Sequence, residues 1–127
     1  MRFARVVFAV AGILGLLIVT PMFFTLETIG QQYPPAITHP DFYYGFVCVT
    51  VAWQIVFLTI ATDPVRYRPL MLVALLEKFP YVAMLLWLYS RGQLPQVQLL
   101  AVASDGTLGV LFVVAYLKTR KPDRRAY

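Results

Sequence analysis

Long apolar runs separated by short polar segments dominate the pattern along the chain. The first run, Val6–Phe24, has nineteen residues without a charge, and further runs cover about residues 42–61, 70–89 and 96–117. A helix needs about 20 apolar residues to cross the hydrocarbon core of a bilayer. Pro69 and Pro95 open the last two runs, at first-turn positions where a helix tolerates proline. The pattern therefore predicts an all-α fold, a four-transmembrane-helix bundle with helices at about residues 4–25, 42–61, 69–90 and 95–118.

Composition places the chain in the integral membrane class. Of its 127 residues, 60% are hydrophobic and 13% are charged, and the mean hydropathy is +0.70. A soluble domain has about a quarter of its residues charged. We therefore expect residues 1–127 to form a single transmembrane domain with the lipid bilayer as its main partner. The first run is longer than the apolar region of a signal peptide, and no small-residue cleavage pattern follows it, so we expect a retained helix.

The basic residues predict the orientation of the helices. Nine Lys or Arg residues flank the runs on one side, and only Arg91 lies on the other side. Basic residues are enriched on the cytoplasmic side of membrane proteins, so we expect both termini in the cytoplasm. The net charge of +5 is then a topology signal, and no nucleic-acid partner is predicted. The nine residues are Arg2, Arg5, Arg66, Arg68, Lys118, Arg120, Lys121, Arg124 and Arg125.

Three ionisable residues, Glu77, Lys78 and Asp105, lie inside the apolar runs. A charge at the centre of a spanning helix costs roughly 2.5–3.5 kcal/mol on insertion scales, so such residues usually face the interior and mark function. With a rise of about 1.5 Å per residue, Glu77 lies about 12 Å from the cytoplasmic end of its helix and Asp105 about 15 Å from the outer end. Gln54 lies about 12 Å from the cytoplasmic face by the same arithmetic. The three helices thus share one polar layer.

Neighbouring residues complete a predicted ligand-binding set. Lys78 follows Glu77 directly and points about 100° away, so the two cannot pair head-on, and Lys78 can reach Asp105 or the cytoplasmic surface. We expect Lys78 to be held by Asp105 or Glu77 and not by lipid. Pro80 leaves the carbonyl of Leu76 without its helical donor. The alternative interpretation is that these polar residues only hold the helices together by hydrogen bonds. The predicted ligand-binding residues are Glu77, Asp105, Gln54, Lys78, Tyr81, Gly12 and Gly15, in which the two glycines leave room for a ligand.

Other kinds of chemistry find no support in the residue pattern. The sequence contains no phosphate loop, nucleophile elbow or zinc-protease helix. His39 is the single histidine and Cys48 the single cysteine, which is a poor set of metal ligands. No catalytic residue, metal or cofactor is therefore predicted.

Several segments together resemble a known group of proteins. They are His39–Phe46, Trp53-Gln54, the Asp63–Arg68 turn and Glu77-Lys78. In these segments the chain resembles small four-helix bacterial membrane proteins with no assigned activity, which implies a location in the bacterial inner membrane. In helix count and membrane-embedded acids it is more distantly similar to the EXPERA family of sterol isomerases and sigma-2-type receptors. That resemblance implies a cavity for sterols or apolar amines, with Glu77 and Asp105 as its acids, although this chain has no histidine in its apolar runs.

Three hypotheses about function follow from these observations. The first is a binding protein that holds an apolar or cationic small molecule or a lipid among its helices. The second is a small proton-coupled transporter that works as a homodimer, with Glu77 or Asp105 as the proton-carrying acid. The third is a structural subunit of a larger membrane complex, and an enzyme such as an EXPERA-like isomerase is the least supported alternative. Proton movement on ligand addition would indicate the second, and copurification with a partner the third.

Overall fold

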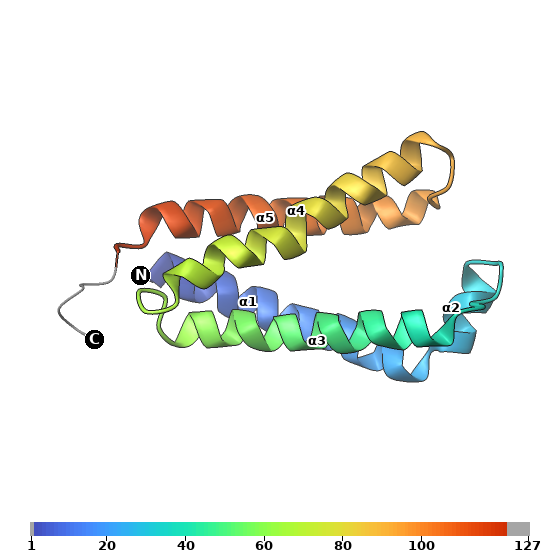
Figure 1. Cartoon of the computed structure of the whole chain (residues 1–127), viewed down its shortest axis with the longest axis horizontal. Helices are drawn as coiled ribbons and strands as arrows, with labels where there is room; N and C mark the ends of the chain where they lie inside the picture. The colour runs from blue at the N-terminus through green and yellow to red at the C-terminus, as the bar shows by residue number, and fades with distance from the viewer. Residues whose placement is uncertain (1, 122–127) are drawn as a thin grey trace.

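The computed structural model describes residues 2–121, and the elements within this range are helices joined by turns. The four long helices are α1 (Arg2–Val19), α3 (Pro40–Thr62), α4 (Arg68–Ser90) and α5 (Leu99–Lys118). A 3-10 helix, η1 (Thr20–Phe24), extends α1, and another, η2 (Gln96–Gln98), precedes α5. The short helix α2 (Leu26–Gln32) lies in the first loop. Figure 1 shows the four long helices as two antiparallel pairs.

Four helical segments are long and apolar enough to cross a membrane. They are Arg2–Phe24, Pro40–Thr62, Arg68–Ser90 and Gln96–Lys118, each of 23 residues. At about 1.5 Å per residue each is about 35 Å long, enough for a hydrocarbon core of about 30 Å. The predicted all-α bundle of four apolar helices is confirmed, with boundaries within two residues of those expected. The chain is an integral membrane protein.

The short helix α2 lies between the first two apolar runs, where the sequence pattern predicted no helix. Its Glu27 occupies the first turn, where the positive end of the helix dipole favours an acid. Gly30 is buried in the same helix, while Glu27 and the last two glutamines are exposed. A seven-residue helix is too short to give a clear periodic signal in a sequence.

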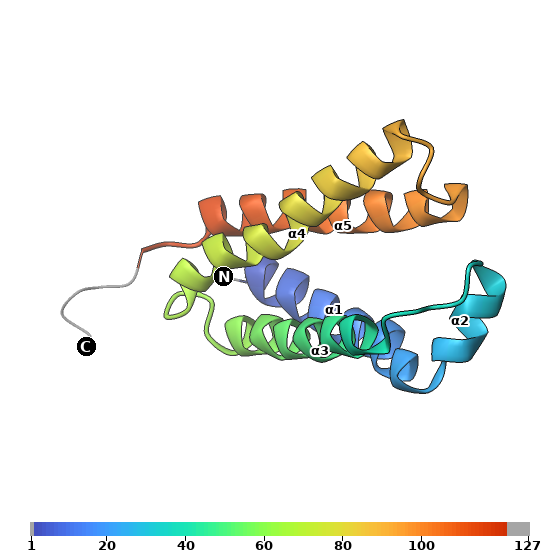
Figure 2. The same cartoon turned by 45° about the vertical axis from the view of Figure 1, so that its right-hand side comes forward.

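The helices pack as two hairpins that meet at one end. α1 packs most extensively against α3, and α4 packs most extensively against α5. Both hairpins converge where α1 begins and α5 ends, and they diverge toward the end that carries α2 (Figures 1 and 2). The bundle is therefore closed at the end where α1 begins and α5 ends, called the closed end below. It is more open toward the opposite end, and that part of the bundle is called the outer half below.

The hydrophobic core fills the closed end. At its centre Phe112 stacks on Phe8, with ring centroids 4.3 Å apart, and meets Phe57 edge-on at 5.0 Å. All three side chains are fully buried. Alanines on all four helices surround them and let the helix backbones approach closely; they are Ala4, Ala11, Ala61, Ala74 and Ala115. The outer half exposes large apolar side chains instead, including Leu17, Ile18, Met84 and Leu100.

The basic residues gather at the closed end. Figure 1 places the start of α1, the α3–α4 turn and the end of α5 together there, and Arg91 follows α4 at the opposite end. Arg124 and Arg125 lie outside the described residues. The direction in which the bundle crosses the membrane stays a prediction from these charges.

Candidate functional site

Lys78 joins α4 to α5 near the middle of the membrane-spanning segments. Its side chain is only 6% exposed, and its Nζ atom donates a hydrogen bond to Oδ1 of Asp105 at 3.3 Å. Lys78 lies about 15 Å along α4 from Arg68, at 1.5 Å per residue. The expectation that Lys78 reaches Asp105 is confirmed.

Lys78 also contacts Glu77, although neighbouring positions on a helix point about 100° apart. Its Nζ atom lies 3.0 Å from Oε2 of Glu77. Two long side chains can bend toward each other although their Cβ atoms point in different directions. The contact is an ion pair at hydrogen-bond distance, but its direction is poor, and within residues 2–121 the buried Oε2 atom has no well-aligned hydrogen-bond donor. Glu77, Lys78 and Asp105 are called the carboxylate–lysine cluster below.

Two residues outside the predicted set shape this cluster. The Nζ atom of Lys78 lies 5.4 Å from the ring centroid of Phe57 on α3, within cation–π distance. A Cβ atom on Gly109 would lie 3.4 Å from Cβ of Lys78 and 3.0 Å from the ring of Phe79. Gly109 therefore lets α4 and α5 approach closely, one turn from Asp105. The sequence did offer a signal for Gly109, because it follows Asp105 by four residues and so lies on the same face of its helix. Nothing local in the sequence relates Phe57 to Lys78.

Gln54, Gly12 and Gly15 form a separate contact between α1 and α3. Gln54 is 3% exposed, and its Nε2 atom donates a hydrogen bond to the carbonyl oxygen of Thr50 at 2.9 Å. A Cβ atom on Gly15 would overlap the side chain of Gln54. A Cβ atom on Gly12 would lie 2.7 Å from Cγ of Leu58.

The space that these glycines were expected to leave for a ligand is therefore filled. The physical reason is that small residues let two helix backbones approach, and the side chains of the neighbouring helix then occupy the gap. Equal depth placed Gln54 in the same layer as Glu77, but the direction in which each helix faces sends Gln54 toward α1.

The carboxylate–lysine cluster lies at the border between the closed core and the outer half. Phe57 and Phe112 lie on its core side, and Tyr81 lies one turn beyond Glu77 on α4, toward the outer half. The Glu77 and Asp105 side chains are 16% and 21% exposed, and Tyr81 is 37% exposed. Two carboxylates share one ammonium group, so the cluster carries one net negative charge when all three groups are ionised.

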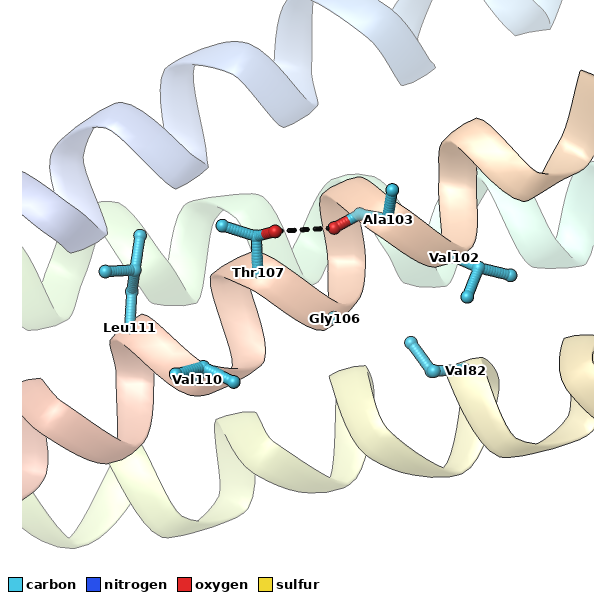
Figure 3. Close-up of a pocket in the computed structure, with 7 residues that line it drawn as sticks. All are labelled: Val82, Val102, Ala103, Gly106, Thr107, Val110 and Leu111. Carbon is cyan, nitrogen blue, oxygen red and sulfur yellow. Dashed lines mark hydrogen bonds between the residues drawn. The ribbon is translucent and has the colours of Figure 1, made fainter.

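A shallow groove of about 490 Å³ lies beside this cluster between α5 and Val82 of α4. Figure 3 shows its lining, which is apolar apart from the Thr107 hydroxyl, and that hydroxyl donates to the carbonyl oxygen of Ala103 at 2.7 Å. The charged residues of the cluster are not part of the lining. The groove suits an apolar chain or another helix rather than a charged ligand. It is lined by Val82, Val102, Ala103, Gly106, Thr107, Val110 and Leu111.

No protein-family model, curated protein or solved structure matches the chain. The resemblances drawn from the sequence therefore stay predictions. The geometry of the carboxylate–lysine cluster carries the functional argument.

Proposed function

We propose that the chain is a small protein of the bacterial inner membrane that binds an amphiphilic molecule with a cationic head. Glu77 and Asp105 are its anionic contacts, and the apolar part of the ligand lies in the outer half of the bundle. One observation carries this proposal. Within residues 2–121 the buried Oε2 atom of Glu77 lies 3.0 Å from Nζ of Lys78, which it shares with Asp105, and has no well-aligned hydrogen-bond donor, although the Glu77 side chain is 16% exposed.

Charge supports a cationic head. A buried charged group is costly unless it is paired and hydrogen-bonded. Lys78 neutralises one of the two carboxylates and donates its hydrogen bond to Asp105. A ligand ammonium group at Glu77 would supply a well-aligned donor and the second positive charge that the two carboxylates lack. A carboxylate or phosphate head would instead add a third negative charge at the same place.

The surroundings support an apolar body. Tyr81 and Met84 follow Glu77 on α4 at spacings of four and seven residues, which place them on the same helix face. Their side chains are 37% and 53% exposed. A hydrocarbon chain can lie along this face toward the outer end of α4, with its head at Glu77. On the core side Phe57 and Phe112 are fully buried, so the ligand enters from the outer half.

The experiment is a binding titration of the purified protein in detergent with two probes of equal chain length, decylamine and decanol. A hydrogen bond to a charged group contributes about 1.5–3 kcal/mol, which is more than tenfold in affinity. Glu77→Gln should therefore weaken decylamine binding at least tenfold and leave decanol binding unchanged. Glu27→Gln, in the exposed first turn of α2, is the matched control and should bind as the wild type does. Equal binding of decylamine to wild type and Glu77→Gln would contradict the proposal, provided that both melt at the same temperature.

A structural subunit is a second candidate, and the α5 groove favours it. A Cβ atom on Gly106 would meet nothing within 4 Å, so a helix of another protein can approach α5 closely at this point. Copurification of a partner protein from the native membrane would support this candidate over ligand binding if it is lost in Gly106→Leu and retained in Glu77→Gln.

The dimeric proton-coupled transporter has a test of its own. Proton uptake by proteoliposomes on addition of decylamine, abolished in Glu77→Gln, would support it.

A further inference from the structure

Seven basic residues at the closed end of the bundle lack acidic partners in the described part of the chain. Within residues 2–121 both ion pairs belong to Lys78. Asp63 lies at the same end, and its Oδ1 atom accepts a hydrogen bond from the backbone N–H of Arg66 at 3.2 Å. The positive charge is therefore left for a partner outside the described residues. The seven residues, called the basic end below, are Arg2, Arg5, Arg66, Arg68, Lys118, Arg120 and Lys121.

Arg68 is the most firmly held member of the basic end. Its Nε–H group donates to the carbonyl oxygens of Thr119 at 2.9 Å and of Tyr116 at 3.3 Å. Its guanidinium carbon lies 3.7 Å from the ring centroid of Tyr116. These contacts satisfy carbonyl groups at the end of α5, which have no helical donor. They use only the Nε–H group of Arg68, so the two terminal NH₂ groups are fixed in place and remain available to an acceptor.

Lys118 extends the charged surface from α5 to α1. Its Nζ atom lies 4.6 Å from the ring centroid of Phe3, which places it beside the start of α1. Arg2 and Arg5 are exposed on that first part of α1. The N-termini of α1 and α4 and the C-termini of α3 and α5 all lie at this end (Figure 1), so the helix dipoles offset one another and the side chains supply the positive charge.

We infer that the basic end binds the phosphate headgroups of anionic phospholipids, with Arg68 as the central donor. Orientation in the membrane needs only positive charge, and lysine serves as well as arginine for that purpose. A fixed guanidinium group adds something else, because its planar set of donors matches phosphate oxygens two at a time. Basic residues near a bilayer surface each contribute about 1 kcal/mol of attraction to anionic lipid. This inference does not depend on the proposed ligand at Glu77.

The experiment compares two lipids in their effect on thermal stability. Purified protein in neutral detergent receives phosphatidylglycerol or phosphatidylcholine, and the melting temperature is measured for each variant. The readout is the difference between the two lipids within one variant, so that a change in basal stability cancels. The wild type should be stabilised more by phosphatidylglycerol. Arg68→Lys retains the charge and should lose at least half of this difference. Lys118→Gln should reduce it, and Arg91→Gln at the opposite end should leave it intact.

Several results would overturn the inference. They are an equal effect of the two lipids on the wild type, a full lipid difference in Arg68→Lys, or a loss in Arg91→Gln as large as that in Lys118→Gln. Inorganic phosphate is the third arm, and stabilisation by phosphate equal to that by phosphatidylglycerol would assign the site to a soluble anion. If Arg68→Lys does not fold, native mass spectrometry of Lys118→Gln decides the matter. Fewer retained phosphatidylglycerol molecules than in the wild type would support the inference, and an equal number would contradict it.

Discussion

Replacing Lys78 by methionine removes the positive charge at the centre of the carboxylate–lysine cluster and nearly retains the side-chain volume. The change leaves two carboxylates without a positive partner where Lys78 was 6% exposed and lay 3.0 Å and 3.3 Å from their oxygens. Removing one partner of a buried ion pair typically costs about 3–5 kcal/mol. Because Glu77 and Asp105 keep some exposure, we expect Lys78→Met to lower the free energy of unfolding by about 3 kcal/mol, the lower end of that range.

The partner change Asp105→Asn should cost less. It removes a hydrogen bond between charged groups, which contributes about 1.5–3 kcal/mol, but Lys78 retains its contact with Glu77. In the double variant the second change removes part of the negative charge that the first change left unpaired. We therefore expect the double variant to be more stable than the sum of the two losses predicts, by about 1–2 kcal/mol, within the usual range for residues in contact.

The assay is equilibrium unfolding in mixed micelles, in which the fraction of SDS is raised and helicity is followed by circular dichroism. The four proteins needed are the wild type, Lys78→Met, Asp105→Asn and the double variant. Strict additivity, within about 0.5 kcal/mol, would show that the two residues are not coupled. A single loss below about 1 kcal/mol for Lys78→Met would show that the buried pair has no more effect than a surface ion pair.

Three further predictions test the packing and the orientation. Gly12→Ala should destabilise the bundle by about 1–3 kcal/mol, because its Cβ atom would lie 2.9 Å from a backbone oxygen of α3. Gly106→Ala is the matched control, since nothing lies within 4 Å of a Cβ atom there, and it should be neutral or stabilising by up to about 1 kcal/mol. Equal losses for the two variants would refute the packing argument. Phe112→Ala should cost about 3–5 kcal/mol in the same unfolding assay, since its ring is fully buried between two others, and a loss below 1 kcal/mol would contradict the placement of the core. Single cysteines at positions 33 and 121, in a Cys48→Ala background, should react with an impermeant thiol reagent from opposite sides of the membrane, and reaction from the same side would refute the four-span orientation.

Much of the fold follows from hydropathy because the bilayer imposes one length on every spanning helix. The first apolar run and the prolines at 69 and 95 mark three of the four helices directly, and each boundary falls within two residues of the observed one. The short helix α2 does not follow in this way, because seven residues give neither the length nor the periodicity of a spanning helix. The divergence of the two hairpins also has no local signal, since it depends on how all four helices pack around Phe8, Phe57 and Phe112.

The level at which Lys78 and Asp105 meet was predicted correctly, but the directions in which the polar residues face were predicted only in part. Counting residues along α4 and α5 brought Lys78 and Asp105 to one level, and they are hydrogen-bonded. The same count brought Gln54 to that level, but Gln54 faces Gly15 on α1. Depth depends on the number of residues alone, whereas the facing direction depends on which helix is the neighbour. Hydropathy identifies four apolar helices, but it does not show which helices are neighbours in the bundle.

The most direct test of the central claim is an experimental structure of the protein with decylamine bound. Our account predicts density for the amine head at the carboxylate of Glu77, with nitrogen and oxygen about 2.7–2.9 Å apart, and density for the alkyl chain along Tyr81 and Met84. A carboxylate of Glu77 that is fully hydrogen-bonded by the protein itself, with the amine bound elsewhere or absent, would contradict it.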